Sequence, residues 1–161
     1  MEINKLYNYL HEYFEYREGE FYYKKAKPRI VVGQKAGGLT NNKYINIGIL
    51  GKLYLAHRLI FLYHKGYLPK EIDHIDRNKL NNKIENLREV TKSENMANRK
   101  KHKTNKSGYK GVAYHKASKK WRASVRINKK DVWIGCYKTP ELAYFHYCEF
   151  VKANLPIHCL E

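Results

Sequence analysis

The apolar residues in the first part of the chain have helical spacing in some segments and strand-like runs in others. Ile3, Leu6 and Leu10 recur at three- and four-residue intervals, the spacing of one helix face, which predicts a helix over residues 3–16. Short runs rich in aromatic and β-branched side chains follow, as is typical of strands, and a second helical pattern then stops at Gly66. The expected elements are strands at 20–25, 44–49 and 52–55, a glycine-rich loop at 33–38, a hairpin turn at 50–51 and a helix at 56–65.

Residues 71–98 follow a different order: strand, polar loop, strand and helix. Two short extended runs, 71–75 and 87–90, enclose a loop in which Asn, Asp and Lys dominate, as they do in surface turns. Thr91 and Glu94 form a T-x-x-E capping box, so a helix is expected to begin directly after the second strand.

The last part of the chain predicts a small sheet and one helix. Strands are expected at 111–114, 121–127 and 131–137, with turns at 116–119 and 128–130 and a helix at 141–153 behind Pro140. The segment before this sheet is too charged to be buried, and we interpret it as a basic linker. The expected fold class is α+β, with an N-terminal domain at 1–100, a linker at 101–106 and a C-terminal domain at 107–161, in which a three-stranded antiparallel sheet packs on one helix.

Charge indicates the class of partner. The 161 residues are 43% hydrophobic, as in a globular protein, and their 32 Lys plus Arg against 15 Asp plus Glu give a formal net charge of +17. This surplus favours nucleic acid or an anionic membrane surface. No apolar run approaches the ~18 residues of a spanning helix and no signal peptide is visible, so we expect double-stranded DNA and no membrane. Between Asn95 and Lys130 there are thirteen Lys or Arg and no acidic residue, which places the main binding face in the second half.

Four polar residues supply the groups that hydrolysis of a phosphodiester needs. A neutral imidazole can take a proton from water near cellular pH, so His74 is the candidate general base. Neighbouring side chains on a strand point to opposite sides, so Asp73 can hold a cation while His74 faces the water. Asn95, on the capped helix, would complete an oxygen-only protein shell that suits Mg²⁺ or Mn²⁺ more than zinc. Asn86 can accept the imidazole N–H through its side-chain or backbone carbonyl and fix the tautomer.

Each of these groups also has an ordinary structural interpretation. An isolated Asp-His pair is common on protein surfaces, and asparagines in a polar loop are usually turn residues. His57 can contact phosphate or simply pack within its helix, and Arg58 and Arg88 can be phosphate clamps or plain surface charge. The joint order of strand, loop, strand and capped helix, with all four groups in place, favours the functional interpretation.

That joint order resembles the HNH endonucleases of the ββα-metal fold, in particular the homing type of phages and introns, over roughly residues 40–100. The segments that carry the resemblance are His57-Arg58-Leu59-Ile60, Asp73-His74-Ile75-Asp76-Arg77-Asn78, Ile84-Glu85-Asn86-Leu87-Arg88-Glu89-Val90-Thr91, Glu94-Asn95 and Asn98. The resemblance implies that His74 is the general base, that Asp73 and Asn95 hold the metal, and that Asn86 orients His74. The last motif position is often histidine in the wider family, and Asn95 at this position favours the homing branch.

A second resemblance, to AP2-type DNA-binding domains, covers the C-terminal domain. It rests on Ser107-Gly108-Tyr109-Lys110-Gly111-Val112, Lys120-Trp121-Arg122-Ala123, Ile134-Gly135-Cys136-Tyr137 and Glu141-Leu142-Ala143-Tyr144, in that order. It implies that the sheet enters the major groove. Arg122 and Arg126 alternate with apolar residues along their strand, so they are the first candidates for base or phosphate contacts. The secondary candidates are Lys110, Tyr114, Lys116 and Lys120, and either or both of Trp121 and Trp133 can belong to the core.

We therefore expect a metal-dependent DNA endonuclease, a site-specific homing-type nickase that uses one divalent metal and no small-molecule cofactor. One such site cuts one strand, so a monomer would nick. The alternative is a non-catalytic, sequence-specific DNA-binding regulator with a relic HNH fold. A structural zinc protein fails on ligand spacing, since no pairs at zinc-knuckle intervals occur among His102, His115, His146, Cys148, His158 and Cys159. The expected location is the cytoplasm, that of the host cell if a phage encodes the protein.

Overall fold

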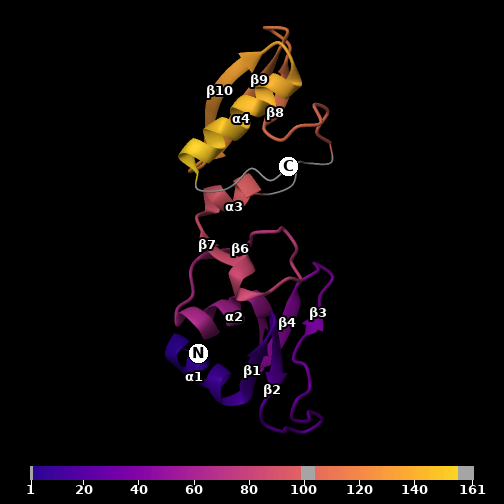
Figure 1. Cartoon of the computed structure of the whole chain (residues 1–161), viewed down its shortest axis with the longest axis vertical. Coiled ribbons are helices and arrows are strands. Elements are labelled where there is room, and N and C mark those ends of the chain that lie inside the picture. The colour runs from indigo at the N-terminus through magenta and orange to yellow at the C-terminus, as the bar shows by residue number, and fades with distance from the viewer. Residues whose placement is uncertain (1, 99–103, 156–161) are drawn as a thin grey trace. The chain divides into compact units, whose positions relative to one another are not determined.

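The structure, a computed structural model, describes residues 2–98 and 104–155 and is a mixed α+β structure with small sheets (Figure 1). The chain divides into two compact units, Met1–Glu89 and Val90–Glu161. The elements in chain order are α1 (Ile3–Tyr13), β1 (Phe14–Arg17), β2 (Glu20–Tyr23), β3 (Gly38–Leu39), β4 (Ile45–Ile49), β5 (Lys52–Leu55), α2 (Ala56–Lys65), β6 (Glu71–His74), the 3-10 turn η1 (Ile84–Asn86), β7 (Leu87–Val90), α3 (Lys92–Asn98), β8 (Val112–His115), β9 (Lys120–Ile127), β10 (Lys130–Tyr137) and α4 (Pro140–Asn154). Among the described residues, no helix has both the length and the apolar character that a membrane span requires.

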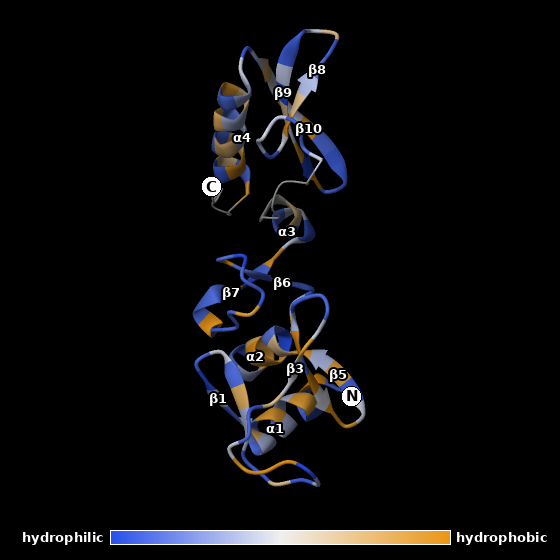
Figure 2. Cartoon of the chain, turned by 90° about the vertical axis from the view of Figure 1, so that its right-hand side faces the viewer, coloured by the Kyte–Doolittle hydropathy of each residue, from blue (hydrophilic) through white to orange (hydrophobic). Residues whose placement is uncertain are grey.

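The first unit packs α1 and α2 against small antiparallel sheets. β1 pairs with β2 in a hairpin, and β3, β4 and β5 pair in chain order. α2 contacts α1, β4, β5 and η1, so the core of this unit also supports the segment that carries the candidate chemistry. Apolar residues (orange in Figure 2) line the inner sides of these elements, and the most buried of them include Leu10, Phe14, Phe21, Ile47 and Ile60, each at most 1% exposed.

The second unit is a three-stranded antiparallel sheet, in the order β8-β9-β10, with α4 on one face. Ala123 and Val125 of β9 are buried in the same core as Ala143 and Tyr147 of α4. Gly111, which precedes β8, has a φ of 71°, and a Cβ there would lie 2.2 Å from the Tyr147 ring, so glycine permits this close approach. α3 also belongs to this unit and contacts β9.

The strands and the helix expected in the C-terminal part agree with the structure in their order and in their first and last residues. β8, β9, β10 and α4 begin and end within one residue of the expected ranges, and the sheet packs on the one helix. The alternation of buried and exposed positions along β9 explains this agreement, because it allows one register against the helix. Residues 101–103 of the expected linker at 101–106 lie outside the described residues. The compact second unit itself begins at Val90.

Two expectations for the first unit are wrong. The helix predicted over residues 3–16 ends at Tyr13, and Phe14–Arg17 is instead strand β1. Phe14 is fully buried in the core that α1 faces. Its position therefore fits the spacing of buried residues on the helix, although its backbone is extended. A short strand, β3, also overlaps the end of the expected loop at 33–38, because Gly38–Leu39 pairs with Ile45 and Asn46 of β4.

Candidate active site

β6 places Asp73 and His74 on opposite sides of the strand. Burial alternates along Glu71–His74, with Ile72 and His74 buried and Asp73 only partly so. His74 is 5% exposed, although histidine is usually more accessible than this. The side chain is therefore fixed within the first unit and presents only a small edge to solvent.

The loop between β6 and β7 is held by Asp76 and Asn86. The Asn86 side chain accepts a hydrogen bond from the Asp76 backbone N–H (3.0 Å) and donates to Asp76 Oδ1 (2.9 Å) and to the Asn81 carbonyl (2.7 Å). Asn81 Nδ2 donates to Asp76 Oδ2 at 2.7 Å. Burial raises the pKa of Asp76, but hydrogen bonds from Asn81, the Asn78 backbone and Asn86 outweigh it, so the pKa lies below its ordinary value. Asn86 thus closes this loop onto the strand end, and its carbonyl accepts from Ile75 N–H at 2.9 Å.

The imidazole of His74 contacts a different asparagine from the one expected. Its Nε2 lies 3.0 Å from Oδ1 of Asn82, and Asn82 is itself only 2% exposed. The sequence offered no means of selecting this residue, because Asn78, Asn81 and Asn82 are equivalent members of one polar loop. A buried asparagine among surface-type neighbours is visible only once the loop has folded.

A second histidine lies beside His74. His57, on α2, is 6% exposed, and its ring centroid is 5.1 Å from that of His74 in an edge-to-face arrangement. Tyr44 packs on both rings, at 5.4 Å from His57 and 6.4 Å from His74, and the Lys79 ammonium lies 4.3 Å from the Tyr44 ring centroid. Burial, and then the charges of His74 and Arg58, lower the pKa of His57 to about 3. His57 is therefore neutral at cellular pH, and its burial favours the packed interpretation.

Arg88 and Arg58 both have protein partners. Arg88, on β7, donates to Asp73 Oδ2 at 3.1 Å, and the two side chains are only 22% and 12% exposed. Arg58 donates to the backbone carbonyls of Pro69 (3.0 Å) and Lys70 (3.3 Å) and so holds the chain that leads into β6. Arg88 thereby orients the carboxylate that the sequence assigns to the metal.

Asn95 lies on α3, in the second unit, whereas the other three expected site residues lie in the first. The predicted capping box is present: Glu94 Oε2 accepts from Thr91 N–H at 2.5 Å, and Thr91 Oγ1 accepts from Glu94 N–H at 3.2 Å. The side chain of Asn98, the last quoted residue of the motif, lies outside the part of the structure that is described.

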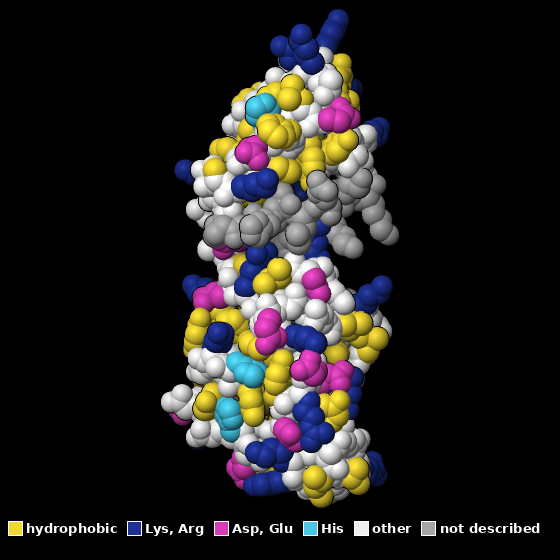
Figure 3. Space-filling model, in the orientation of Figure 1, with side chains coloured by type: hydrophobic (Ala, Val, Ile, Leu, Met, Phe, Trp, Pro, Cys, Tyr) yellow, Lys and Arg dark blue, Asp and Glu magenta, His cyan; other side chains and the backbone are white. Residues whose placement is uncertain are grey.

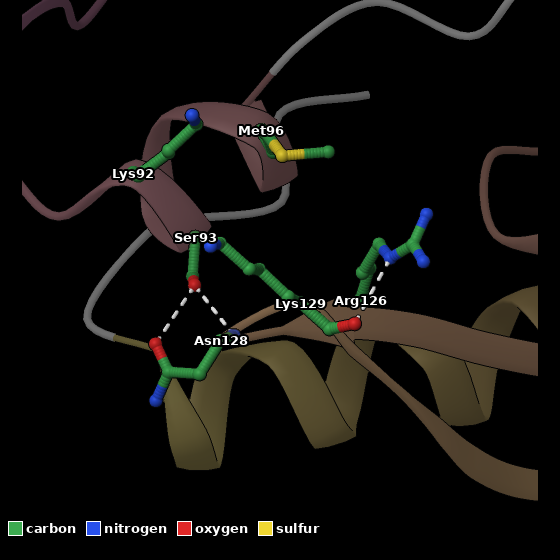
Figure 4. Close-up of a pocket in the computed structure, with 6 residues that line it drawn as sticks. All are labelled: Lys92, Ser93, Met96, Arg126, Asn128 and Lys129. Atoms are coloured by element: carbon green, nitrogen blue, oxygen red, sulfur yellow. Dashed lines mark hydrogen bonds between the residues drawn. The ribbon is translucent and has the colours of Figure 1, made fainter.

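α3 is fastened to the turn between β9 and β10. Ser93 Oγ donates to Asn128 Oδ1 at 3.2 Å and accepts from the Asn128 backbone N–H at 2.9 Å (Figure 4). These residues line a pocket of about 550 Å³ that is rimmed by cationic side chains, and its lining is Lys92, Ser93, Met96, Arg126, Asn128 and Lys129. The helix that carries Asn95 is therefore a structural part of the C-terminal unit.

The donor set fits a hard divalent cation only with help from outside the protein. Within residues 2–98 and 104–155, no three His, Cys, Asp or Glu side chains gather into a group able to hold a metal. A carboxylate such as Asp73 and a carboxamide such as Asn95 are oxygen ligands of the kind that Mg²⁺ and Mn²⁺ accept. The remaining positions would have to be filled by water and substrate phosphate, as is usual for Mg²⁺.

The C-terminal sheet has a polar face opposite α4. Arg122 and Ser124 lie on β9 beside Cys136 and Trp133 of β10, while Ala123 points into the core. Trp133 is 55% exposed, and the Arg122 guanidinium lies 5.8 Å from its ring centroid. Of the two tryptophans, Trp121 packs against the core and Trp133 does not.

The other expected DNA contacts are distributed around this sheet. Arg126 is exposed and pairs with Asp131 at 3.4 Å, and Lys110 donates to the Met96 carbonyl at 3.3 Å. The exposed residues Tyr114, Lys116 and Lys120 lie on β8, in the β8–β9 turn and at the start of β9. Cationic side chains (dark blue at the top of Figure 3) project from the end of the unit where this turn lies in Figure 1.

Comparison with known proteins covers the segment that carries the four expected site residues. Residues 54–97 match the family model described as HNH endonuclease. The match includes Asp73, His74, Asn86 and Asn95, and it supports an HNH assignment for this segment and a nuclease-type function.

A curated relative covers a longer part of the chain. Protein 3.8 of Escherichia phage T7 is 44% identical over 67 residues, which are 42% of this chain and 53% of that protein. The chain thus spans about half the length of this relative. No solved structure matches.

Proposed function

We propose that this protein is a metal-dependent DNA endonuclease of the HNH homing type, which nicks double-stranded DNA at specific sites. The observation that carries the proposal is the HNH match over residues 54–97, within which a buried histidine follows a partly buried carboxylate on one strand. The basic composition favours DNA as the substrate, and the host cytoplasm would be the place of action.

His74 would act as the general base. In the hydrolytic step, the O–H bond of a water molecule breaks, its proton goes to the imidazole, and its oxygen bonds to phosphorus. The bond from phosphorus to the leaving sugar oxygen breaks, and that oxygen takes a proton from solvent. Neutral His57 beside His74 adds no second positive charge to repel the imidazolium that forms.

Asp73 and Asn95 would hold the divalent cation. Bound Mg²⁺ or Mn²⁺ would supply neutralisation of the charge that builds on the phosphate and its leaving oxygen. Arg88 orients the Asp73 carboxylate through their 3.1 Å contact. Asn86 would act indirectly, since its hydrogen bonds hold the loop that leaves the end of β6.

The C-terminal unit would supply most of the DNA affinity, as an AP2-like module. Its three-stranded sheet on one helix has the expected architecture, and Arg122, with Trp133 beside it, offers a cation and an aromatic ring on the open face. Arg126, Lys110, Tyr114, Lys116 and Lys120 would add contacts to phosphate or bases. Such a protein can act as a monomer that cuts one strand.

Supercoiled plasmid incubated with the protein tests this proposal, in Mg²⁺ and in EDTA, with His74→Ala beside the wild type. We expect Mg²⁺-dependent open circles, and at least a 100-fold lower rate for His74→Ala, because a positioned base contributes about 10²–10⁴. Its DNA affinity, measured by fluorescence anisotropy, should stay within about twofold. His64→Ala, a change to an exposed histidine of α2, is the matched control and should cut normally.

Cleavage by His74→Ala at the normal rate would refute the base assignment. Binding without any cleavage, on plasmids that carry phage and host sequences, would favour the alternative of a non-catalytic regulator.

A further inference from the structure

We infer that Asn82 is a positioning residue, which holds His74 in the tautomer with a hydrogen on Nε2 and so makes Nδ1 the basic nitrogen. The inference rests on the proposed function, in which His74 is the base. Its starting point is the 3.0 Å contact between two side chains that are 5% and 2% exposed. A carbonyl oxygen can only accept a hydrogen bond, so with Oδ1 of Asn82 as its partner, Nε2 is the nitrogen that donates.

One end of the Asn82 carboxamide carries a cost in stability. Its Nδ2 is buried and has no hydrogen-bond partner among the described residues. Burying such a group costs free energy, so the Nδ2 group does not explain a carboxamide at this position. The His74 contact is therefore what the carboxamide contributes at this position.

The contact gains strength in the course of the reaction. When the imidazole accepts a proton at Nδ1, the ring becomes positively charged, and the bond from Nε2–H to Asn82 Oδ1 becomes a charge-assisted one. Such bonds are about twice as strong as neutral ones. Asn82 thus stabilises the protonated base more than the neutral base, which lowers the barrier and leaves substrate binding unchanged.

The β1–β2 hairpin fixes the backbone that carries Asn82. Gly19, with a φ of 88°, lies so close that a Cβ there would be 3.0 Å from the Asn82 carbonyl carbon and 2.8 Å from Lys83 N. Tyr16 Oη accepts a hydrogen bond from Ile84 N–H at 3.1 Å, and Lys83 Nζ donates to Glu18 Oε2 at 2.5 Å. These contacts hold the loop on either side of Asn82 from a segment that precedes the HNH match at 54–97.

Asn82 and Asn86 thus have separate tasks. The carboxamide of Asn86 is occupied by Asp76 and by the Asn81 carbonyl, and it closes the loop. Asn82 is the asparagine whose side chain contacts the imidazole. A loss of Asn86 would disturb the loop as a whole, whereas a loss of Asn82 would act through His74.

The test combines a spectrum with steady-state kinetics on the full chain. In ¹⁵N-histidine NMR, with His74 assigned from the His74→Ala spectrum, wild type should show the neutral ring with its hydrogen on Nε2. For Asn82→Ala we expect kcat lowered about 10- to 100-fold with KM within twofold, and a changed His74 signal. Asn82→Asp keeps an oxygen acceptor and should recover most of the lost kcat. Asn46→Ala is the matched control, since Asn46 is another carboxamide of the first unit, and its buried Oδ1 has no hydrogen-bond partner in the described part of the chain.

Two results would overturn the inference: a wild-type ring with its hydrogen on Nδ1, or Asn82→Ala that keeps the wild-type kcat and His74 signal. Should Asn82→Ala not fold, Asn82→Asp and the wild-type spectrum still decide. A wild type that shows the Nε2–H ring but cuts no DNA would refute the proposed function and leave the Asn82–His74 contact established.

Discussion

Removal of His57 should make the first unit less sensitive to acid. Its imidazole is 6% exposed and packs against Tyr44 and His74, with Arg58 next to it in sequence. Burial first, and then the charges of His74 and Arg58, lower the pKa of His57 from 6.5 to about 3. Between these two pH values, His57 binds a proton in the unfolded chain but not in the folded chain. The contribution of neutral His57 to the free energy of unfolding is therefore complete above pH 6.5 and is lost as pH falls toward 3.

The magnitude follows from linkage between proton binding and folding. Between pH 7 and pH 5, protonation of His57 in the unfolded chain should lower the free energy of unfolding by about 2 kcal/mol. The carboxylates with lowered pKa values, Asp76 among them, lose their contribution only at lower pH, because their ordinary values are near 4. Partial burial also lowers the pKa of His64, so His64 makes the protein sensitive to acid in the same direction. His64 is unchanged in the His57 variant, and its effect is therefore the same in both proteins.

The measurement is urea unfolding at pH 7 and pH 5, followed through the amide signals of Ile60 in the first unit and Ala123 in the second. Wild type should lose about 2 kcal/mol more at Ile60 than His57→Phe does over this interval. His57→Gln serves as a second variant in case the larger ring of phenylalanine does not pack. The Ala123 signal is the internal control, because it reports unfolding of the second unit, which does not contain His57. A His57→Phe protein with the same acid sensitivity as wild type would refute the argument that His57 is neutral in the fold.

Two further predictions concern the second unit. Ser93→Ala removes both hydrogen bonds between α3 and Asn128, so protection of the Asn95 amide from hydrogen exchange should fall about 10-fold, with the exposed-turn variant Ser118→Ala as control. Equal protection in the two variants would mean that these bonds do not hold α3. The plot of log DNA-binding constant against log salt concentration has a negative slope. Arg122→Gln should reduce the magnitude of that slope by about 0.9, as expected for one lost phosphate contact, while Lys5→Gln on α1 should not. An unchanged slope for Arg122→Gln would exclude a phosphate contact for this residue.

The sequence predicts elements best where one pattern permits one structure. Along β9, alternation puts Ala123 and Val125 on the helix side, and the observed strand agrees with the prediction. The pattern was ambiguous at Phe14, because both a fourth helical turn and a strand bury this ring in the same core. The turn at Glu18–Gly19, with positive φ at both residues, decides for the strand, and side-chain periodicity does not contain that information.

The local geometry around the candidate site could be predicted for residues whose place depends on neighbours in sequence. Asp73 and His74 alternate because they are adjacent on a strand, and the capping box at Thr91 and Glu94 is local. The partner of His74 depends instead on how the loop after β6 brings Asn82, eight residues further on, back to the strand, with Gly19 of the β1–β2 hairpin in close contact. No spacing rule could have separated Asn82 from its neighbours, since the difference between them is burial.

The division of the chain gives the candidate metal ligands different structural supports. Asp73 is held by Arg88 within the first unit, whereas Asn95 lies on a seven-residue helix whose packing partner is the sheet of the second unit. A helix of this length is marginal on its own in water, so α3 depends on Ser93, Asn128 and β9 for its order. A chain shortened after residue 103 would keep Asp73, His74 and Asn82 in place but would lose the support of Asn95. If Asn95 is a metal ligand, the C-terminal unit contributes to metal binding as well as to DNA affinity.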